Sequence, residues 1–237
     1  MREIIDFHSH ILPDIDDGSA SVEESIALLR QQAEQGIRHV VATPHFYPQY
    51  DNPEHFLKKR AEAETALRQQ MQAHTGLPTL SIGAEVYFFH GISESDAITE
   101  LTIDQKRCIL IEMIMPPWSD SVYRELEGLH TKRGLVPIIA HLDRYIRPFH
   151  THKIPERLAE LPVLVQANAE FFTERSTASM ALRMLKKNQI HLLGSDCHNL
   201  TDRKPNLGAA LDVIEKKLGE SVLKEIRKYQ QFVLEGE

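Results

Sequence analysis

Short apolar runs rich in β-branched residues recur along the whole chain, separated by longer, more polar segments. These runs predict seven strands, at residues 3–8, 37–43, 79–88, 107–113, 135–141, 162–168 and 190–196. The segments between them have the patterns of helices, and strands that alternate with helices indicate βα units and a parallel sheet. Seven units favour an α/β fold of the closed or distorted TIM-like (β/α)7 type over an open doubly wound sheet. No strand is followed by the G-x-G-x-x-G motif of dinucleotide-binding folds.

Three of the helical segments have recognisable ends. Residues 21–36 begin with a capping box, Ser21 to Glu24, and end at Gly36, a glycine of the kind that closes helices. Residues 53–72 begin with Pro53, which is favoured in a first turn, and residues 119–134 form a third helix. No internal repeat, low-complexity tract or long linker interrupts the pattern, so we expect a single catalytic domain over residues 1–237.

Composition narrows the class of protein. Hydrophobic residues make up 42% and charged residues 26% of the 237 residues, as in globular chains with a sizeable core. A net charge of −7 and a pI of about 6.0 argue against binding to nucleic acid or anionic lipid. The two cysteines make no disulfide framework, and no apolar run reaches the roughly 18 residues of a membrane span. We therefore expect a cytoplasmic protein without membrane insertion.

Histidines and carboxylates recur at the carboxyl ends of the predicted strands. The first strand ends at His8 and His10, which project together because alternate residues of a strand share a face. Later strand ends carry further polar residues of the same kinds, namely His45, Glu85, Glu112, His141, Asp196 and His198. The carboxyl ends of the strands of a βα barrel converge on the face that holds catalytic residues, so these side chains predict one site.

The residue types in this predicted site suit metal ions. Imidazole nitrogens and carboxylate oxygens together favour Zn, Mn or Fe, and the lack of paired thiolates argues against a structural zinc site. The candidate ligands are too many for one ion and fit two or three ions bridged by carboxylates: His8, His10, Asp17, His45, Glu85, Glu112, His141, Asp196 and His198. Such clusters activate water and bind both oxygens of a phosphoryl displacement.

Several candidates also have simpler interpretations. Glu85 and Glu112 lie in apolar strands, and each could pair instead with a buried arginine or lysine, since an unpaired carboxylate is costly to bury. His45 follows a proline in a predicted loop and could be merely exposed. Seven further histidines are interpreted as ordinary surface or packing residues: His39, His55, His74, His130, His150, His152 and His191.

The aspartates at positions 14, 16 and 17 lie in one loop. Such a cluster is typical of a turn that leads into a helix, because aspartate side chains bind nearby backbone N–H groups. We expect only one or two of the three to serve the metal site, and Asp17 is the one assigned to it.

A family resemblance covers nearly the whole chain. The segments D-F-H-S-H, D-D-G, T-P-H, G-A-E, I-E, A-H-L-D-R-Y and S-D-C-H-N, in this order, resemble the PHP (polymerase and histidinol phosphatase) superfamily. More closely, they are similar to the CpsB/CapC-type tyrosine phosphatases of bacterial capsule and exopolysaccharide clusters. The resemblance runs from about residue 4 to residue 208.

The resemblance implies a PHP fold and a trinuclear site that usually depends on manganese, with Fe, Co or Zn as alternatives. It implies a protein-tyrosine phosphatase acting on the C-terminal tail of a membrane-associated tyrosine autokinase that controls capsule or exopolysaccharide synthesis. Hydroxide held between the ions would attack phosphorus. By this resemblance the nine candidates are metal ligands, and Arg144 and Arg203 bind phosphate. Guanidinium groups suit that role because they bind phosphate oxygens in a bidentate manner.

Alternatives remain at the level of the sequence. Cys197 and Arg203 have the C-x5-R spacing of cysteine-dependent tyrosine phosphatases, although the residues between them lack the glycines that let a backbone approach phosphate. Arg144 could instead form a salt bridge with Asp143 or with another neighbour. Another phosphoesterase, such as a histidinol phosphate phosphatase, or a catalytically silent kinase-binding barrel are rival functions. The loop at residues 45–55 is aromatic and not basic, which departs from the family pattern.

Overall fold

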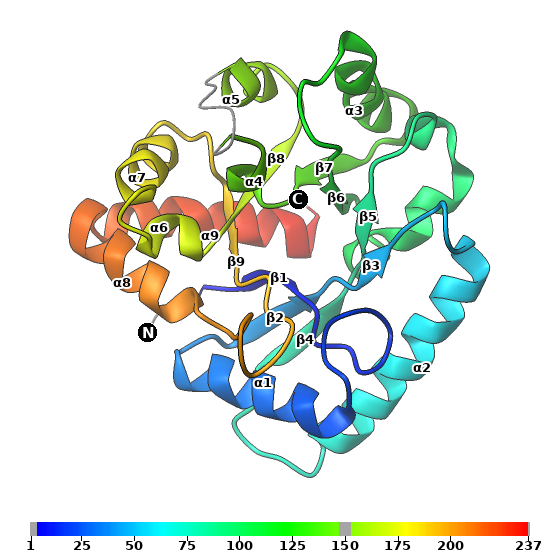
Figure 1. The fold of residues 1–237 in the computed structure, drawn as a ribbon, viewed down its shortest axis with the longest axis vertical. Coiled ribbons are helices and arrows are strands. Elements are labelled where there is room, and N and C mark those ends of the chain that lie inside the picture. The colour runs from blue at the N-terminus through cyan, green and yellow to red at the C-terminus, as the bar shows by residue number, and fades with distance from the viewer. Residues whose placement is uncertain (1–3, 147–152, 237) are drawn as a thin grey trace.

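The computed structural model describes residues 4–146 and 153–236, which form a curled parallel sheet surrounded by helices (Figure 1). Every strand pair in these residues is parallel. The strands are β1 (Asp6–Ser9), β2 (His39–Ala42), β3 (His45–Phe46), β4 (Thr79–Ile82), β5 (Glu85–Tyr87), β6 (Cys108–Glu112), β7 (Val136–Ile139), β8 (Leu164–Asn168) and β9 (Leu192–Gly194).

The strands are hydrogen-bonded in two groups, ordered β1-β2-β4 and β3-β5-β6-β7-β8-β9. Backbone bonds join the groups where β2 runs on into β3 and β4 into β5: the N–H of Gly83 donates to Ala42 O at 2.8 Å, and that of Glu85 to Pro44 O at 2.9 Å. At the other edge, Ser9 forms a parallel bridge with Cys197, just beyond β9. The strand order thus closes on itself, which confirms the predicted distorted TIM-like (β/α)7 fold.

Two predicted strands differ in detail from the structure. The single strand expected at residues 79–88 is divided at Gly83 and Ala84 into β4 and β5. Beyond the strand expected at residues 37–43, His45 and Phe46 form the additional strand β3, which pairs with Glu85 and Val86. Both differences arise at one place, because Pro44 has no N–H to donate and the sheet is interrupted there.

The helices are α1 (Val22–Glu34), α2 (Pro53–Met71), α3 (Asp120–Arg133), α4 (Leu142–Ile146), α5 (Lys153–Leu158), α6 (Glu170–Thr173), α7 (Ala178–Lys186), α8 (Leu207–Leu218) and α9 (Glu220–Glu235), with short 3-10 turns at Ile92–Glu94, Asp96–Leu101 and Ile103–Gln105. The predicted capping box is present, since Ser21 Oγ accepts the N–H of Glu24 at 3.2 Å. Gly134, with φ of 66°, ends α3 in a left-handed conformation that glycine adopts without strain.

The interior of the barrel is apolar below the strand ends. Buried side chains from β1, β6, β7 and other strands form one cluster there, joined by Val233 of α9. The C-terminal helix α9 also contacts residues that precede β1: Gln230 Nε2 donates to Ile5 O at 3.4 Å. Hence α9 covers the amino-terminal end of the barrel and leaves the carboxyl-terminal end for a site.

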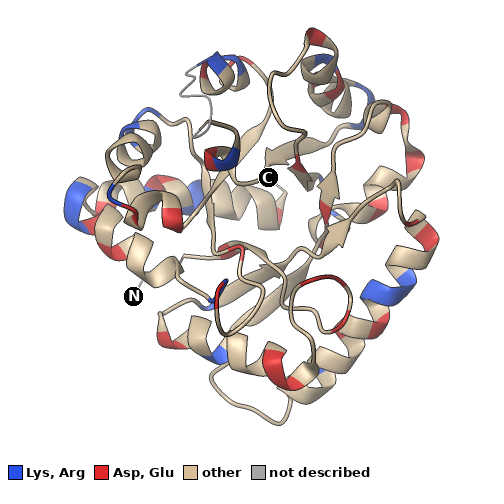
Figure 2. Ribbon diagram, viewed as in Figure 1, with Lys and Arg blue, Asp and Glu red and all other residues tan. Residues whose placement is uncertain are grey.

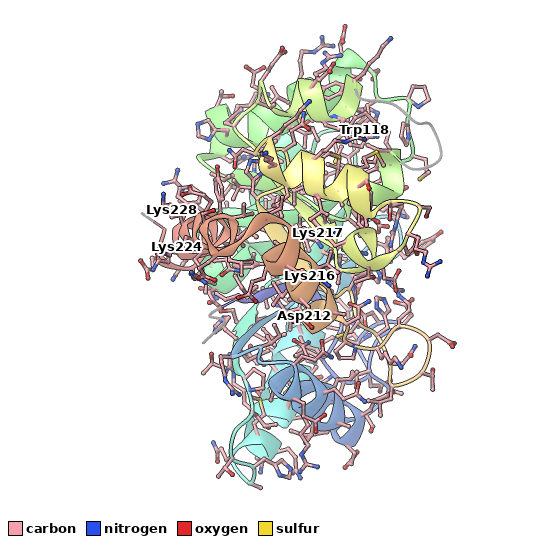
Figure 3. All side chains as sticks on the ribbon, turned by 90° about the vertical axis from the view of Figure 1, so that its left-hand side faces the viewer. Trp118, Asp212, Lys216, Lys217, Lys224 and Lys228 are labelled. Carbon is pink, nitrogen blue, oxygen red and sulfur yellow. The ribbon has the colours of Figure 1, made fainter. Side chains whose placement is uncertain are left out.

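The outer faces of α8 and α9 are polar. Lys216 and Lys217 on α8 and Lys224 and Lys228 on α9 are all exposed, as is Asp212 (Figure 3). Within the described residues, no helix is both long and apolar enough to span a lipid bilayer.

Candidate metal centre

The carboxyl ends of the strands bring all nine predicted ligands to one place. Their ligand atoms form four overlapping groups, and within each group these atoms lie within 4.8 Å of one another. The groups are His10, Asp17, His45 and His198; His8, Glu85 and His141; His8, His10 and Asp196; and His45, Glu85 and Glu112. The acidic loop that contributes Asp17 follows β1 at this end of the barrel (Figure 2).

Glu85 lies at the centre of this cluster. Its Oε2 lies 3.2 Å from His8 Nε2, 3.3 Å from His10 Nε2 and 3.0 Å from His45 Nδ1. Its other oxygen lies 2.7 Å from His141 Nε2. Burial works against the charged carboxylate, yet the surrounding histidines hold the pKa of Glu85 well below its usual range. The simpler interpretation, that Glu85 pairs with a buried arginine or lysine, does not apply.

His8 and His10 face each other with their Nε2 atoms only 3.1 Å apart. Both Nε2 atoms also face Asp196 Oδ1, at 3.5 and 3.4 Å. Burial lowers the pKa of each histidine, but the neighbouring carboxylates outweigh burial and raise both pKa values. The short distances among these atoms bring ring nitrogens and carboxylate oxygens together from several sides, as a cation site requires once the rings are neutral.

The cluster also leaves buried polar atoms without hydrogen-bond partners. Three of the seven such atoms in the described residues belong to the cluster: His141 Nδ1, His198 Nε2 and Glu85 Oε2, which forms no hydrogen bond despite the ring nitrogens near it. Because unpaired buried polar atoms are rare and costly, three of them within one cluster indicate that a group absent from the protein itself completes the site. Neutral imidazole and carboxylate donors in this number fit divalent transition-metal ions.

His45 and Asp17 lie on the open side of the centre. The side chain of His45 is only 10% exposed, and its Nε2 lies 3.4 Å from Asp17 Oδ1. The idea that His45 is merely exposed is therefore wrong. Asp17 itself is 67% exposed, and its Oδ1 also lies 3.4 Å from His198 Nε2.

Asp16 is a site residue that the sequence analysis did not select. Its Oδ2 lies 2.8 Å from His10 Nδ1 and accepts the N–H of His45 at 2.9 Å. Its Oδ1 accepts the N–H of Gly18 at 2.9 Å. Asp16 therefore orients two candidate ligands, whereas Asp14 is exposed, which agrees with the expectation that only one or two of the three aspartates serve the site.

Two amides of β8 were also missed by sequence reasoning. Gln166 Oε1 accepts the backbone N–H of His141 at 2.6 Å and lies 3.2 Å from His8 Nδ1. Asn168 Nδ2 donates to Asp196 Oδ2 at 3.0 Å. Their position at the end of a predicted strand was an available signal, but amides are poor ligands and did not stand out.

Two of the six non-glycine residues with positive φ in the described part of the chain lie at the same place. His141 and Asp196, which follow β7 and β9, have φ values of 32° and 52°. These values are costly for residues with a side chain, and such strain persists where surrounding contacts impose it.

Asp6 supports the segment before Asp196, because its carboxylate accepts the N–H and Oγ–H of Ser195 at 2.8 and 2.5 Å. Burial raises the pKa of Asp6 to about 6.

The two predicted phosphate-binding arginines border the centre. Arg144 Nη1 donates to Glu112 Oε1 at 2.6 Å and its Nη2 to Asp196 Oδ2 at 3.5 Å, whereas Arg203 Nη2 donates to Asp196 Oδ1 at 2.8 Å. The side chains of both arginines are 39% exposed. Within the described residues, Arg144 thus pairs with Glu112 and Asp196, two carboxylates of the cluster, and not with the adjacent Asp143.

Asp143 is instead buried and accepts the N–H of Asn168 at 3.2 Å. Burial raises its pKa. Its contact is with the backbone of β8, so Asp143 has the surroundings of a residue that orients its neighbours.

Cys197 does not have the surroundings of a nucleophile. Its side chain is fully buried, and its Sγ accepts a hydrogen bond from Gln32 Nε2 of α1 at 3.6 Å. Burial raises the pKa of its thiol to about 12, whereas a nucleophilic cysteine needs a lowered pKa. The C-x5-R spacing is therefore accidental.

Within the described residues, the histidines interpreted as ordinary (His39, His55, His74, His130 and His191) do not belong to the four ligand groups. His39 Nδ1 lies 2.6 Å from Thr79 Oγ1, and His191 Nδ1 accepts the N–H of Val165 at 2.9 Å. His55 lines a cavity beside His45. The remaining ones in the described part of the chain are His74 and His130, and the predictions for His150 and His152 lie outside the described residues.

Comparison with known proteins supports this interpretation of the site. The chain is 32% identical over 233 residues to the tyrosine-protein phosphatase CpsB of Streptococcus pneumoniae, covering 94% of each protein. It is 30% identical over 227 residues to the tyrosine-protein phosphatase YwqE of Bacillus subtilis (strain 168), covering 91% of this chain and 85% of YwqE.

Solved structures resemble the fold as well. Crystal structures of YwqE from Bacillus subtilis and CpsB from Streptococcus pneumoniae, described as unique metal-dependent tyrosine phosphatases, match with a TM-score of 0.87 and 25% identity, covering 99% of this chain and 95% of the matched chain. A D-hydantoinase, 12% identical with a TM-score of 0.52, is similar in fold alone, over 94% of this chain and 68% of its own. Residues 4–231 match the family described as capsular polysaccharide synthesis, CpsB/CapC, and the chain therefore belongs to this CpsB/CapC family.

Proposed function

We propose that this chain is a metal-dependent protein-tyrosine phosphatase that hydrolyses phosphotyrosine in the C-terminal tail of a bacterial tyrosine autokinase. The autokinase is associated with the membrane and controls capsule or exopolysaccharide synthesis, and the phosphatase acts on it from the cytoplasm. The observation that carries the proposal is a cluster of nine ligand-type side chains bordered by two half-exposed arginines. The names of the relatives support the same reaction.

The residues proposed to hold two or three metal ions are His8, His10, Asp17, His45, Glu85, Glu112, His141, Asp196 and His198. Mn²⁺ is the proposed resident ion, since carboxylates and imidazoles suit it, and Fe, Co or Zn fit the same donors. When bound, such ions lower the pKa of water and neutralise charge on a phosphoryl group.

Arg144 and Arg203 are proposed to bind the non-bridging oxygens of the phosphoryl group. Both guanidiniums already lie against the carboxylates of the cluster, so each is held in place before substrate arrives. A guanidinium has five N–H donors, and the exposed part of each side chain leaves donors for phosphate oxygens. Negative charge shifts toward the leaving oxygen in the transition state. The two guanidiniums are already in place, so they stabilise this transition state without reorganisation.

The leaving group accounts for a preference for tyrosine. The phenol of tyrosine has a pKa near 10, so its phenolate leaves far more readily than the alkoxide of serine. We assign no general acid to the site, because Asp143 is buried against β8, and a site without one relies on a good leaving group.

Two rival functions make different predictions about the substrate. A histidinol phosphate phosphatase would have a similar metal site and would prefer a small alkyl phosphate. A catalytically silent kinase-binding barrel would turn over neither substrate. The test compares phosphotyrosine and phosphoserine peptides, histidinol phosphate and p-nitrophenyl phosphate after metal stripping and repletion with Mn²⁺. Equal kcat/KM on both peptides, or a preference for histidinol phosphate, would contradict the tyrosine assignment.

The arginines are tested in the same assay. Arg144→Ala and Arg203→Ala should each reduce kcat/KM for phosphotyrosine by an amount that corresponds to about 1.5–3 kcal/mol, with metal content unchanged. Arg68→Ala is the matched control, because Arg68 is similarly exposed but pairs with Glu64 on α2. Arginine variants that behave like the control would remove these residues from the site.

A further inference from the structure

Large apolar side chains are exposed at one end of the barrel. In the described residues, the exposed ones are Tyr50 at 84%, Met115 at 53% and Leu200 at 37%. They follow β3, β6 and β9, and the carboxyl ends of parallel strands lie at the same end of a barrel. Single exposed apolar residues are ordinary, but here all three lie on the face of the metal centre.

Each of these side chains lies on a loop that also carries residues of the site. Tyr50 follows His45, and Met115 follows Glu112, whereas Leu200 lies between His198 and Arg203. We call Tyr50, Met115 and Leu200 the apolar rim. Because every member shares its loop with a candidate site residue, the rim lies at the same end of the barrel as the candidate site.

The three loops are held in place by defined contacts. Tyr47 stacks on His45 with ring centroids 5.0 Å apart and contacts Tyr50 edge-on at 6.3 Å. The N–H of Met113 donates to Tyr145 Oη at 2.7 Å, which anchors the start of the second loop. In the third, Asn199 Oδ1 accepts backbone N–H groups of the following residues, including Arg203 at 3.1 Å.

A cavity of about 540 Å³ adjoins the metal centre at Tyr50. Its walls include Asp17 and His45, which also belong to the centre, the apolar or aromatic side chains Ile15, Tyr47, Tyr50 and Phe56, and the polar side chains Asp16, Asp51, His55 and Lys59. The cavity is continuous with the candidate site and is large enough for an apolar side chain. It therefore extends the contact surface beyond the reacting phosphate.

We propose that the apolar rim binds apolar side chains on either side of the phosphotyrosine in an extended polypeptide segment, with the cavity at Tyr50 receiving one of them. The inference rests on the proposed phosphatase function and names the sequence context of its substrate. When a substrate covers apolar surface beside the reaction site, that surface is removed from water, and this favours binding of the substrate. A small polar monoester such as histidinol phosphate would leave the whole rim in water.

The test uses two phosphotyrosine peptides of equal length and charge. One has leucine or valine at the positions next to phosphotyrosine, and the other has serine there. The readout is the ratio of the two kcat/KM values within one variant, so that any change in the chemistry common to both cancels. For the wild-type enzyme we expect a ratio of about ten in favour of the apolar peptide. In the combined variant Tyr50→Ser, Met115→Ser, Leu200→Ser the ratio should fall close to one.

A binding measurement separates this inference from the proposed function. The unphosphorylated apolar peptide, followed by fluorescence anisotropy, should bind the wild-type chain more tightly than the combined variant, whether or not the chain hydrolyses phosphotyrosine. If the wild type and the combined variant had equal kcat/KM ratios, or equal affinities for the peptide, the proposal that the apolar rim binds these side chains would be wrong. A wild-type dimer that becomes monomeric in the variant would assign the rim to a second copy of the chain and would also overturn the proposal. Failure to hydrolyse either peptide, with the affinity difference intact, would contradict only the phosphatase function.

Discussion

Glu85 is nearly fully buried and contacts the ring nitrogens of His8, His10, His45 and His141. A carboxylate there is stable only because positive charge or proton donors lie opposite it, since a lone buried charge costs several kcal/mol. The same contacts place one carboxylate between ligands from β1, β3 and the end of β7. At the scale of single residues, the candidate centre therefore depends on how the side chains are oriented around Glu85 as much as on which residue types are present.

The contact between Asp16 and His10 leads to a prediction about ligand orientation. Burial works against the ionised Asp16 carboxylate, but His10 lowers its pKa, so the carboxylate stays charged and keeps the His10 ring in place. Asp16→Asn should weaken metal binding by about 10- to 100-fold without unfolding the barrel. Isothermal titration calorimetry with Mn²⁺ measures this, and Asp14→Asn, at an exposed position of the same loop, is the control. Equal affinities in the two variants would show that Asp16 has no orienting role.

The burial of Cys197 leads to a second prediction at this scale. Because its thiol points toward Gln32 and is not ionised near neutral pH, Cys197→Ser should keep kcat for p-nitrophenyl phosphate within about tenfold of wild type. The serine hydroxyl can accept the same hydrogen bond from Gln32. A loss of several orders of magnitude, or a trapped phosphocysteine, would make the thiol the nucleophile after all.

Among the elements, the contact between β1 and β9 positions the first two ligands. The N–H of Asp196 donates to His8 O at 2.8 Å, and the N–H of His10 donates to Cys197 O at 2.9 Å. Gly194 at the end of β9 permits this close approach, because a Cβ there would lie 2.5 Å from the Cβ of His8. Because Gly194 has no side chain, His8 can lie close to the end of β9.

Gly194→Ala should therefore displace His8 and reduce both metal affinity and activity, because core positions tolerate little added volume. Gly83→Ala is a control in another part of the sheet, since the nearest atom to its Cβ would be Ile103 Cγ1 at 3.0 Å, and Ile103 Cα and Thr43 Cγ2 would lie at ordinary contact distances of 3.6 and 3.7 Å. Metal content by inductively coupled plasma mass spectrometry and turnover of p-nitrophenyl phosphate are the measurements. A Gly194→Ala protein with full metal content would show that the contact is not needed.

At the scale of the whole molecule, ligands from opposite ends of the sequence meet in one cluster, so metal binding should stabilise the entire barrel. An ion that binds only the folded state adds about 2.7 kcal/mol to the free energy of unfolding at 100 times its Kd. For a chain of this size, that corresponds to a rise in Tm of roughly 5 to 10 °C. Differential scanning calorimetry of stripped protein with and without Mn²⁺ measures the shift.

Glu85→Gln should abolish this shift, whereas His39→Gln, a change outside the cluster, should retain it. EDTA should reverse both the shift and the activity. If none of Mn²⁺, Fe²⁺, Co²⁺ and Zn²⁺ raised Tm, the cluster would not be a metal centre.

The sequence by itself determined the strand pattern and the chemistry at the strand ends. Apolar periodicity is local, and the carboxyl ends of parallel strands meet by the rules of the fold, so residues such as His8, Glu85 and His141 were predicted as neighbours without coordinates. The same rule holds for Asp196, although it lies far from the first strand along the chain.

Only the tertiary structure decided which neighbour each of these side chains meets. Arg144 contacts Glu112 and Asp196 because β6 and the end of β9 bring them to α4, although Asp143 is adjacent in sequence. Asp16, and not only Asp17, faces the histidines because the loop after β1 folds back on itself, and the N–H of Ser19 donates to His10 O at 2.9 Å. Side-chain partners are set by distances between segments remote in sequence, and periodicity along a single segment contains no information about those distances.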